Sequence, residues 1–215
     1  MWSGSYNLDI ILLYIVEKGE FMKKGLLIVL SGPSGVGKGT VRKKVFKDES
    51  LNLAYSISMT TRQPRNMEQD GVDYFFVSQD KFKEMIKENK LLEYTYFVGN
   101  YYGTPLEYVE KLRNEGKNVF LEIEVEGAKQ VMERCKNDDV VSIFLIPPSL
   151  EELERRIRGR KSEPDNIIQE RLAKAQKEIN LSSNYQYVVK NDKLADATKR
   201  ISQIIKKRME MQKDI

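Results

Sequence analysis

The residues best suited to chemistry begin with a glycine-rich stretch, residues 32–40 (GPSGVGKGT). It follows the apolar run 26–30 and precedes the helix-favouring residues 41–45, so we expect it to connect a buried strand to a helix. In such a turn, backbone N–H groups and the positive end of the helix dipole surround a polyphosphate, and Lys38 reaches its outer oxygens. The pattern predicts a phosphate-binding loop, the P-loop, rather than a glycine-rich turn with a surface lysine.

The P-loop departs from the usual pattern at the residue after its lysine. Serine or threonine normally stands there, but this chain has Gly39, and the hydroxyl comes one position later, on Thr40. From this spacing we expect magnesium to be held mainly by nucleotide and water, with Thr40 closer to an inner phosphate. A P-loop predicts a bound nucleotide and does not specify the reaction.

Two groups of arginines are candidates for further phosphate contacts. Arg62 and Arg65 flank a turn, and guanidinium groups bind phosphate oxygens bidentately; a solvated surface loop is the alternative. The basic stretch 155–161, broken by Gly159, is expected to form a flexible flap over a polyphosphate. A solvated helix face or a nucleic-acid patch would share its composition, but no interleaved aromatic residues favour nucleic acid.

Three carboxylates, Glu122, Glu124 and Glu126, alternate at the end of a predicted strand, residues 118–127. Residues two apart lie on one face of an extended strand, so we expect the three at one edge of a parallel sheet, where such sheets bind ligands. Like charges this close need a cation or hydrogen-bond donors. That requirement favours a position near magnesium and nucleotide over a solvated edge.

The composition narrows the chemistry further. The 215-residue chain has a net charge of +4, which fits anionic ligands but is too small to indicate nucleic acid. It has no histidine, which excludes Ser-His-Asp triads, Cys-His pairs and histidine metal sites. Phosphoryl transfer needs none of these, because it depends on positioning and charge stabilisation. The single cysteine, Cys135, excludes an intrachain disulfide and fits the cytoplasm.

The order of apolar and amphipathic segments predicts an α/β fold. We expect a three-layer P-loop core, in which helices flank a parallel sheet, with an inserted lobe and a lid. Residues 1–21 are either an extension or the product of an upstream start. Their apolar run, residues 10–16, is too short to span a membrane and no basic segment precedes it, so we expect neither a signal peptide nor an anchor. Strands are expected at 53–59, 71–77, 91–98, 140–146 and 187–192, and helices at 79–89, 105–116 and 128–135.

From about Gly25 to its C-terminus the chain resembles the guanylate kinases, which phosphorylate GMP to GDP with ATP. The resemblance rests on five strings in this order: LSGPSGVGK (30–38), TTRQPR (60–65), GVDYFFV (71–77), GNYYGT (99–104) and RIRGR (156–160). It implies one guanylate kinase-like domain over residues 22–215, with a GMP-binding lobe at about 58–105 and a lid at about 149–164.

The resemblance also implies roles for individual residues. ATP would be bound by Gly32, Pro33, Ser34, Gly35, Val36, Gly37, Lys38, Gly39, Thr40 and Asn191. The GMP phosphate would be held by Arg62, Arg65, Tyr74 and Tyr102, and guanine would be read by Ser58, Glu93, Thr104 and Glu124. The transferring phosphoryl group would be stabilised by Lys38, Arg156, Arg160 and Arg171, and magnesium would be near Thr40 and Glu124, directly or through water.

The chemistry of the bases supports this assignment. Guanine offers N1–H and N2–H donors that one carboxylate accepts together, and an O6 acceptor that hydroxyl groups satisfy, whereas adenine reverses the pattern. A site built for these bonds rejects the wrong base by something on the order of 10⁴-fold. The chain departs from the family at Glu124, where Asp is frequent, at Met67, where glycine often follows the arginine turn, and at Lys161; only Glu124 has an assigned role.

We therefore expect an enzyme that phosphorylates GMP and dGMP with ATP and Mg²⁺. Two alternatives stay open. An inactive guanylate-kinase-like scaffold would be expected to lose P-loop or lid residues, and a kinase for another nucleoside monophosphate would be expected to differ at Glu93 or Thr104. The expected partners are GMP, dGMP and ATP, without nucleic acid or membrane, in a monomer or a homodimer.

Overall fold

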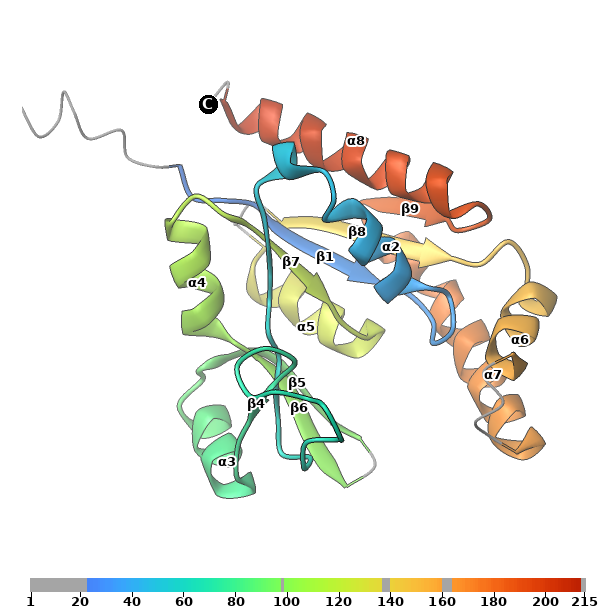
Figure 1. Cartoon of the computed structure of the whole chain (residues 1–215), viewed down its shortest axis with the longest axis horizontal. Helices are drawn as coiled ribbons and strands as arrows, with labels where there is room; N and C mark the ends of the chain where they lie inside the picture. The colour runs from blue at the N-terminus through green and yellow to red at the C-terminus, as the bar shows by residue number, and fades with distance from the viewer. Residues whose placement is uncertain (1–22, 98, 137–139, 160–163, 214–215) are drawn as a thin grey trace, which may run out of the picture.

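The computed structural model describes residues 23–97, 99–136, 140–159 and 164–213. Residues 1–21, for which the sequence suggests an extension or an upstream start, lie outside this set. The centre of the fold is a parallel sheet in the order β2-β7-β1-β8-β9 (Figure 1), which confirms the predicted α/β core. Its strands are β1 (Leu27–Ser31), β2 (Leu53–Tyr55), β7 (Asn118–Glu122), β8 (Val140–Ile146) and β9 (Tyr187–Lys190).

Helices cover both faces of this sheet, which gives the three predicted layers (Figure 1). On one face, Ile28 and Leu30 of β1 pack in an apolar cluster with α2, α6, α7 and α8; on the other, Leu27 and Val29 pack with α4 and α5. Burial on both faces explains the continuous apolar run of β1. No helix in the described part of the chain is long and apolar enough to cross a membrane. The helices are α2 (Lys38–Val45), α4 (Leu106–Asn114), α5 (Val125–Arg134), α6 (Leu150–Arg158), α7 (Asp165–Asn180) and α8 (Leu194–Lys213).

The part of the chain that follows β2 and precedes α4 in the sequence forms a second, smaller sheet, in the order β4-β3-β6-β5. With its helix it makes a unit that we call the lobe, and its small core is built from Met59, Phe82 and Leu91. Figure 1 shows the lobe standing apart from α6 and α7. Its elements are β3 (Met59–Thr60), β4 (Phe75–Phe76), α3 (Gln79–Lys87), β5 (Leu91–Phe97) and β6 (Asn100–Pro105).

The edge strand of the lobe, β5, is bonded to helix α5 of the core. The Gln130 side chain accepts a hydrogen bond from the Tyr94 N–H (3.0 Å) and donates one to the Tyr94 carbonyl (2.9 Å). Arg134 donates to the carbonyls of Leu91 and Asn89, each at 2.8 Å. Helix α5 therefore fixes β5, and with it one wall of the lobe, to the main sheet.

Several predicted strand boundaries were wrong. Residues 53–59, expected as one strand, divide into β2 and β3, which belong to different sheets, because the chain crosses from core to lobe between them. Residues 71–77 are strand only at β4, and residues 100–105 form β6 instead of merely closing β5. Alternating polar and apolar residues fit a strand in any sheet, so the pattern does not reveal such a crossing.

The predicted acidic strand, residues 118–127, was also wrong. Strand β7 ends at Glu122, Glu124 is the N-cap residue of α5, and Glu126 lies in the first turn of that helix. The three carboxylates therefore do not share one strand face. Acidic residues are favoured at a helix N-terminus by its dipole, so the same letters fit a helix start as well as a strand end.

Candidate active site

The P-loop joins β1 to α2 through backbone that requires glycine at two positions. Gly32 has φ +145° and Gly37 has φ +101°, in the region that side chains rarely adopt. A Cβ atom at Gly32 would lie 2.3 Å from the Leu145 carbonyl oxygen, and one at Gly37 would lie 2.8 Å from Asn191 Nδ2. The loop can therefore pack against β8 and the end of β9 only with glycine at both places.

Lys38, the first residue of α2, is drawn into the P-loop. Its Nζ donates to the carbonyl of Gly32 at 2.5 Å and to that of Pro33 at 3.3 Å. Burial lowers the pKa of Lys38, and the nearby carboxylates of Glu124 and Glu122 oppose that shift. A phosphate bound in the loop would offer this ammonium a charged acceptor, which forms stronger hydrogen bonds than a carbonyl.

Glu122 lies where two cavities meet. It lines the P-loop cavity, with Lys38 and Thr40, and it also lines a second cavity, with Ser58 and Glu93. Its Oε2 accepts a hydrogen bond from Arg42 Nε at 2.8 Å. The sequence pattern groups Glu122 with two other carboxylates and gives it no role of its own. Its place at the carboxyl end of a strand next to β1 is the signal that would have found it.

Glu122 also faces the departure in the P-loop. A Cβ atom at Gly39 would lie 3.4 Å from Glu122 Oε1, so this carboxylate stands beside the position where other P-loops carry a hydroxyl. Thr40 lines the same cavity. These hydroxyl and carboxylate oxygens suit Mg²⁺, which prefers oxygen ligands and keeps several waters. Among the residues that the structure describes, no group of three or more acidic, histidine or cysteine side chains forms a complete metal site.

The second cavity, which we call the acceptor pocket, lies between the lobe and the core. Glu93 of β5 is only 5% exposed, and its Oε1 accepts a hydrogen bond from Thr104 Oγ1 of β6 at 2.6 Å. Burial raises the pKa of Glu93 to about 7, although the Thr104 bond opposes the shift. The pocket thus holds a carboxyl group that changes charge near neutral pH. Further residues that line it are Ser58, Tyr74, Tyr102 and Glu124.

Gly127 of α5 makes room for Glu93, because a Cβ atom there would lie 2.4 Å from Glu93 Oε2. With GMP and ATP as the substrates that the sequence resemblance implies, we expect Gly127→Ala to raise the KM for GMP about tenfold, the cost of disturbing one charged hydrogen bond, while the KM for ATP stays unchanged. The melting temperature should not fall by much, since alanine favours a helix over glycine by about 1 kcal/mol. Steady-state kinetics and thermal unfolding of one preparation check both results; an unchanged KM for GMP would contradict this reading of Gly127.

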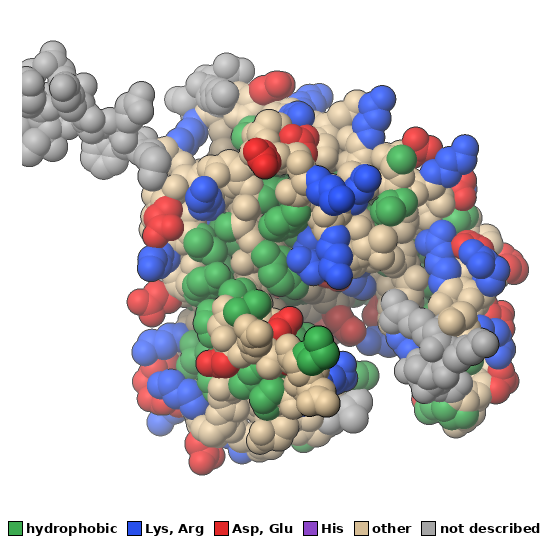
Figure 2. All heavy atoms as spheres, in the orientation of Figure 1, with side chains coloured by type: hydrophobic (Ala, Val, Ile, Leu, Met, Phe, Trp, Pro, Cys, Tyr) green, Lys and Arg blue, Asp and Glu red, His purple; other side chains and the backbone are tan. Residues whose placement is uncertain are grey.

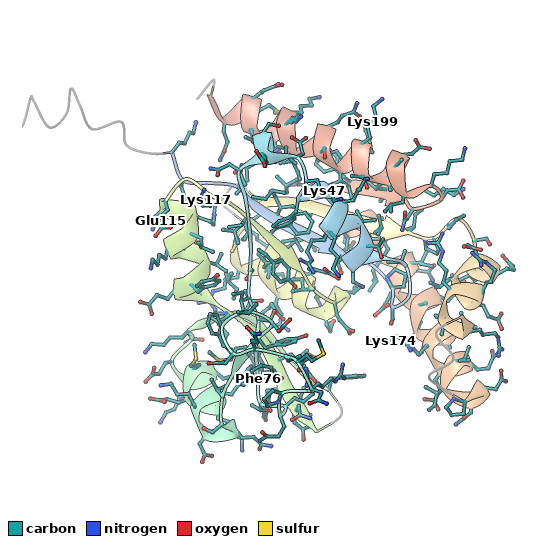
Figure 3. All side chains as sticks on the ribbon, in the orientation of Figure 1. Lys47, Phe76, Glu115, Lys117, Lys174 and Lys199 are labelled. Atoms are coloured by element: carbon teal, nitrogen blue, oxygen red, sulfur yellow. The ribbon has the colours of Figure 1, made fainter. Side chains whose placement is uncertain are left out.

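Arg62 is held by a residue that the sequence did not reveal. Its guanidinium group makes two hydrogen bonds of 3.0 Å to the Glu68 carboxylate, which also accepts the Arg65 N–H at 2.7 Å. The hydrogen bonds and charge of Glu68 raise the pKa of Arg62. Arg62 also lies 5.6 Å from the ring centroid of Tyr74 and 5.9 Å from that of Phe76, a residue labelled in Figure 3. An acidic residue within an arginine-rich turn is the only local signal.

The two predicted arginines of this turn therefore differ. Arg62 lies beside Tyr74, whose ring is 6.3 Å from that of Tyr102, and both tyrosines line the acceptor pocket. The side chain of Arg65 is exposed and is not part of the described pocket lining. The structure thus brings together three of the four residues expected to hold the acceptor phosphate.

Removing Glu68 tests its hold on Arg62. We expect Glu68→Ala to raise the KM for GMP about three- to tenfold, because a freed guanidinium group must be ordered when the phosphate binds. The KM for ATP should not change. Glu84→Ala is the matched control, since Glu84 pairs with Lys81 at 2.8 Å on the exposed surface of the same lobe. Initial rates at varied GMP check the prediction, and equal KM values for the two variants would refute it.

Two of the predicted catalytic arginines, one in α6 and one in α7, contact the P-loop. The guanidinium group of Arg156 in α6 donates to the carbonyls of Val36 (3.3 Å) and Asn191 (3.1 Å), and Arg171 of α7 donates to Ser34 Oγ. Arg160 lies outside the described residues. Figure 2 shows the surface hollowed between the lobe and α6–α7, with charged side chains of both signs visible there.

Asn191 has a structural role beside its expected one. Its side chain is buried, and Nδ2 donates to the Val36 carbonyl at 2.8 Å. The amide therefore supports the P-loop backbone directly. Contact with adenine, which the resemblance implies for Asn191, stays a prediction.

The sequence and the structure are both similar to those of known guanylate kinases. Residues 24–208 match the family model for guanylate kinase. Guanylate kinases of Bacillus cereus and Bacillus anthracis are each 57% identical to the chain over 183 residues, which covers 85% of this chain and 88% of each relative. The crystal structure of guanylate kinase from Anaplasma phagocytophilum is similar at a TM-score of 0.67 and 34% identity, over 86% of both chains. The chain therefore belongs to the guanylate kinase family.

Proposed function

We propose that the chain transfers the γ-phosphoryl group of ATP to GMP and dGMP, with the donor on the P-loop and the acceptor in the lobe. The observation that carries this proposal is the shared position of Glu122, which lines both the P-loop cavity and the acceptor pocket. Phosphates bound in the two cavities would therefore meet at one place. In-line transfer needs that arrangement.

On the donor side, the chain supplies positive charge from three directions. Lys38 comes from α2, Arg156 from α6 and Arg171 from α7, and each contacts a P-loop residue. Charge stabilisation of the transferring group is the main catalytic task in such reactions. Thr40 and Glu124, as expected, and also Glu122 would hold Mg²⁺ directly or through water, and the bound ion would neutralise charge on the phosphates of ATP.

On the acceptor side, Glu93 would accept the N1–H and N2–H donors of guanine, and the hydroxyl groups of Ser58 and Thr104 would complete the reading of the base. Arg62 and the tyrosines Tyr74 and Tyr102 would hold the phosphate, and Arg65 would join them on binding. The attacking phosphate oxygen is already anionic, so no general base is required.

The same observations weigh against the alternatives. A scaffold would have no need for Lys38, Arg156 and Arg171 to meet at the P-loop, and a kinase for AMP would not favour the buried pair of Glu93 and Thr104. We propose domain limits of 22–215, a GMP-binding lobe at about 58–105 and a lid at about 149–164. We place the activity in the cytoplasm, which the single cysteine supports.

A coupled assay with ATP, Mg²⁺ and each of GMP, dGMP, AMP, CMP and UMP tests the proposal. We expect turnover with GMP and dGMP and little with the other three. Absence of GMP turnover by folded protein would refute the proposed transfer. Equal rates with GMP and AMP would refute the proposed reading of guanine.

A further inference from the structure

Helix α7 carries two cations, one turn apart, toward different parts of the site. Arg171 donates to Ser34 of the P-loop, and Lys174, three residues later, lies 3.0 Å from Glu124 Oε2 (Figure 3). Residues at this spacing lie on the same helix face. Both line one cavity, together with Ser34, Glu124 and Phe97. The helix therefore lies next to the P-loop, the start of α5 at Glu124 and the end of the lobe at Phe97.

Lys174 contacts two residues that form the wall of the acceptor pocket. Glu124 and Phe97 both line that pocket. The Lys174 Nζ is bonded to Glu124 and lies 5.8 Å from the ring centroid of Phe97, within the range of a cation–π contact. Lys174 itself lines the cavity beside α7, so it holds the pocket wall from outside.

The charges around Lys174 explain what it contributes. Glu178, one turn further along α7, places its Oε1 3.6 Å from Lys174 Nζ. The Lys174 ammonium therefore lies within ion-pair distance of both carboxylates. Without this ammonium, Glu124 and Glu178 would each lose an ion pair, and Glu124 lies in the wall of a pocket that would receive a phosphate dianion. Lys174 therefore both orients Glu124 and neutralises it.

We propose that Lys174 is a positioning residue for the acceptor nucleotide: it holds Glu124 and Phe97 in the wall of the acceptor pocket. The proposal rests on the proposed function, because it takes GMP as the molecule in that pocket. It gives α7 a second task beside the contact of Arg171 with the P-loop. It also predicts that a residue outside the pocket lining affects the affinity for GMP.

Steady-state kinetics of Lys174→Gln test this role. We expect the KM for GMP to rise about three- to fivefold, the range for one partly exposed ion pair, with kcat and the KM for ATP within about twofold of the parent. Lys174→Arg keeps the charge and should restore most of the affinity. Lys177→Gln is the matched control, because Lys177 is an exposed lysine on the same helix.

A double-mutant cycle separates positioning from a general electrostatic effect. If Lys174 acts through its ion pair with Glu124, Lys174→Gln should raise the KM for GMP less in the Glu124→Gln background than in the parent. Additive effects would overturn the proposal, and so would an unchanged KM for GMP. A fall in kcat at constant KM would also overturn it, since Lys174 would then act on the transferring group. A parent enzyme with no GMP turnover would instead refute the proposed function.

Discussion

Replacing Lys38 with alanine is expected to lower kcat about 10²- to 10³-fold, the usual loss when one group that stabilises transition-state charge is removed. Its ammonium lies inside the P-loop, 2.5 Å from the Gly32 carbonyl oxygen, where it would meet the outer phosphates of ATP. The KM for GMP should change little, because the acceptor pocket is built from other elements. Single-turnover and steady-state rates with ATP and GMP check the prediction.

The matched control for Lys38→Ala is Lys44→Ala, which removes an exposed lysine from the same helix. We expect this variant to keep the kcat of the parent. Thermal unfolding of both variants distinguishes lost chemistry from lost folding. A folded Lys38→Ala enzyme within about tenfold of the parental kcat would contradict the assigned role, because the contribution would then be no larger than that of an ordinary charged hydrogen bond.

The second prediction with a large effect is the pH dependence of GMP binding, which we attribute to Glu93. Burial raises its pKa to about 7, so below that pH the free enzyme carries mainly the neutral carboxyl group. Guanine offers two donors, which the carboxylate accepts together, so GMP binding favours loss of the proton. Affinity is therefore fully present above pH 7 and is lost as the pH falls through 7. We expect the Kd for GMP, measured by calorimetry, to decrease about tenfold from pH 6 to pH 8.

Glu93→Gln separates this titration from that of the GMP phosphate, whose second pKa lies near 6. In this variant, the Kd for GMP should no longer show the change that is centred near pH 7. Its preference for GMP over AMP should fall about 10- to 100-fold, because the glutamine amide places a donor against a guanine donor. Glu126→Gln, an exposed residue of α5, is the control and should keep both properties. A pH profile of Glu93→Gln that matches the parent would show that another group titrates.

The parts of the fold that could be predicted are those with a local signal. The strand at residues 140–146 is apolar except for Ser142, and Ser78 and Ser149 cap their helices by accepting the N–H groups of Lys81 and Glu152. The division of residues 53–59 could not be predicted, because it depends on two distant partners. Tyr55 pairs with β7, and Met59 pairs with β6 of another sheet.

The residues of the candidate site likewise fall into those with a local sequence signal and those without one. The P-loop, Arg62 and Thr104 belong to short strings with a recognisable spacing, and the resemblance that these strings carry implies the role of Glu93. Glu68 and Lys174 have no such string, and in a chain with 32% charged residues a single glutamate or lysine carries little information. Their partners are 6 and 50 residues away in sequence, and only the folded chain brings them together.

The bonds from α5 to β5 have a consequence for association between chains. An open strand edge presents unpaired N–H and C=O groups, which can add a strand from another molecule. At β5, the Gln130 amide occupies both groups of Tyr94 as a neighbouring strand would, and Arg134 occupies the carbonyl of Leu91. Two helix side chains thus serve as a substitute strand, and they protect the strand that carries Glu93 from edge-to-edge aggregation at these positions.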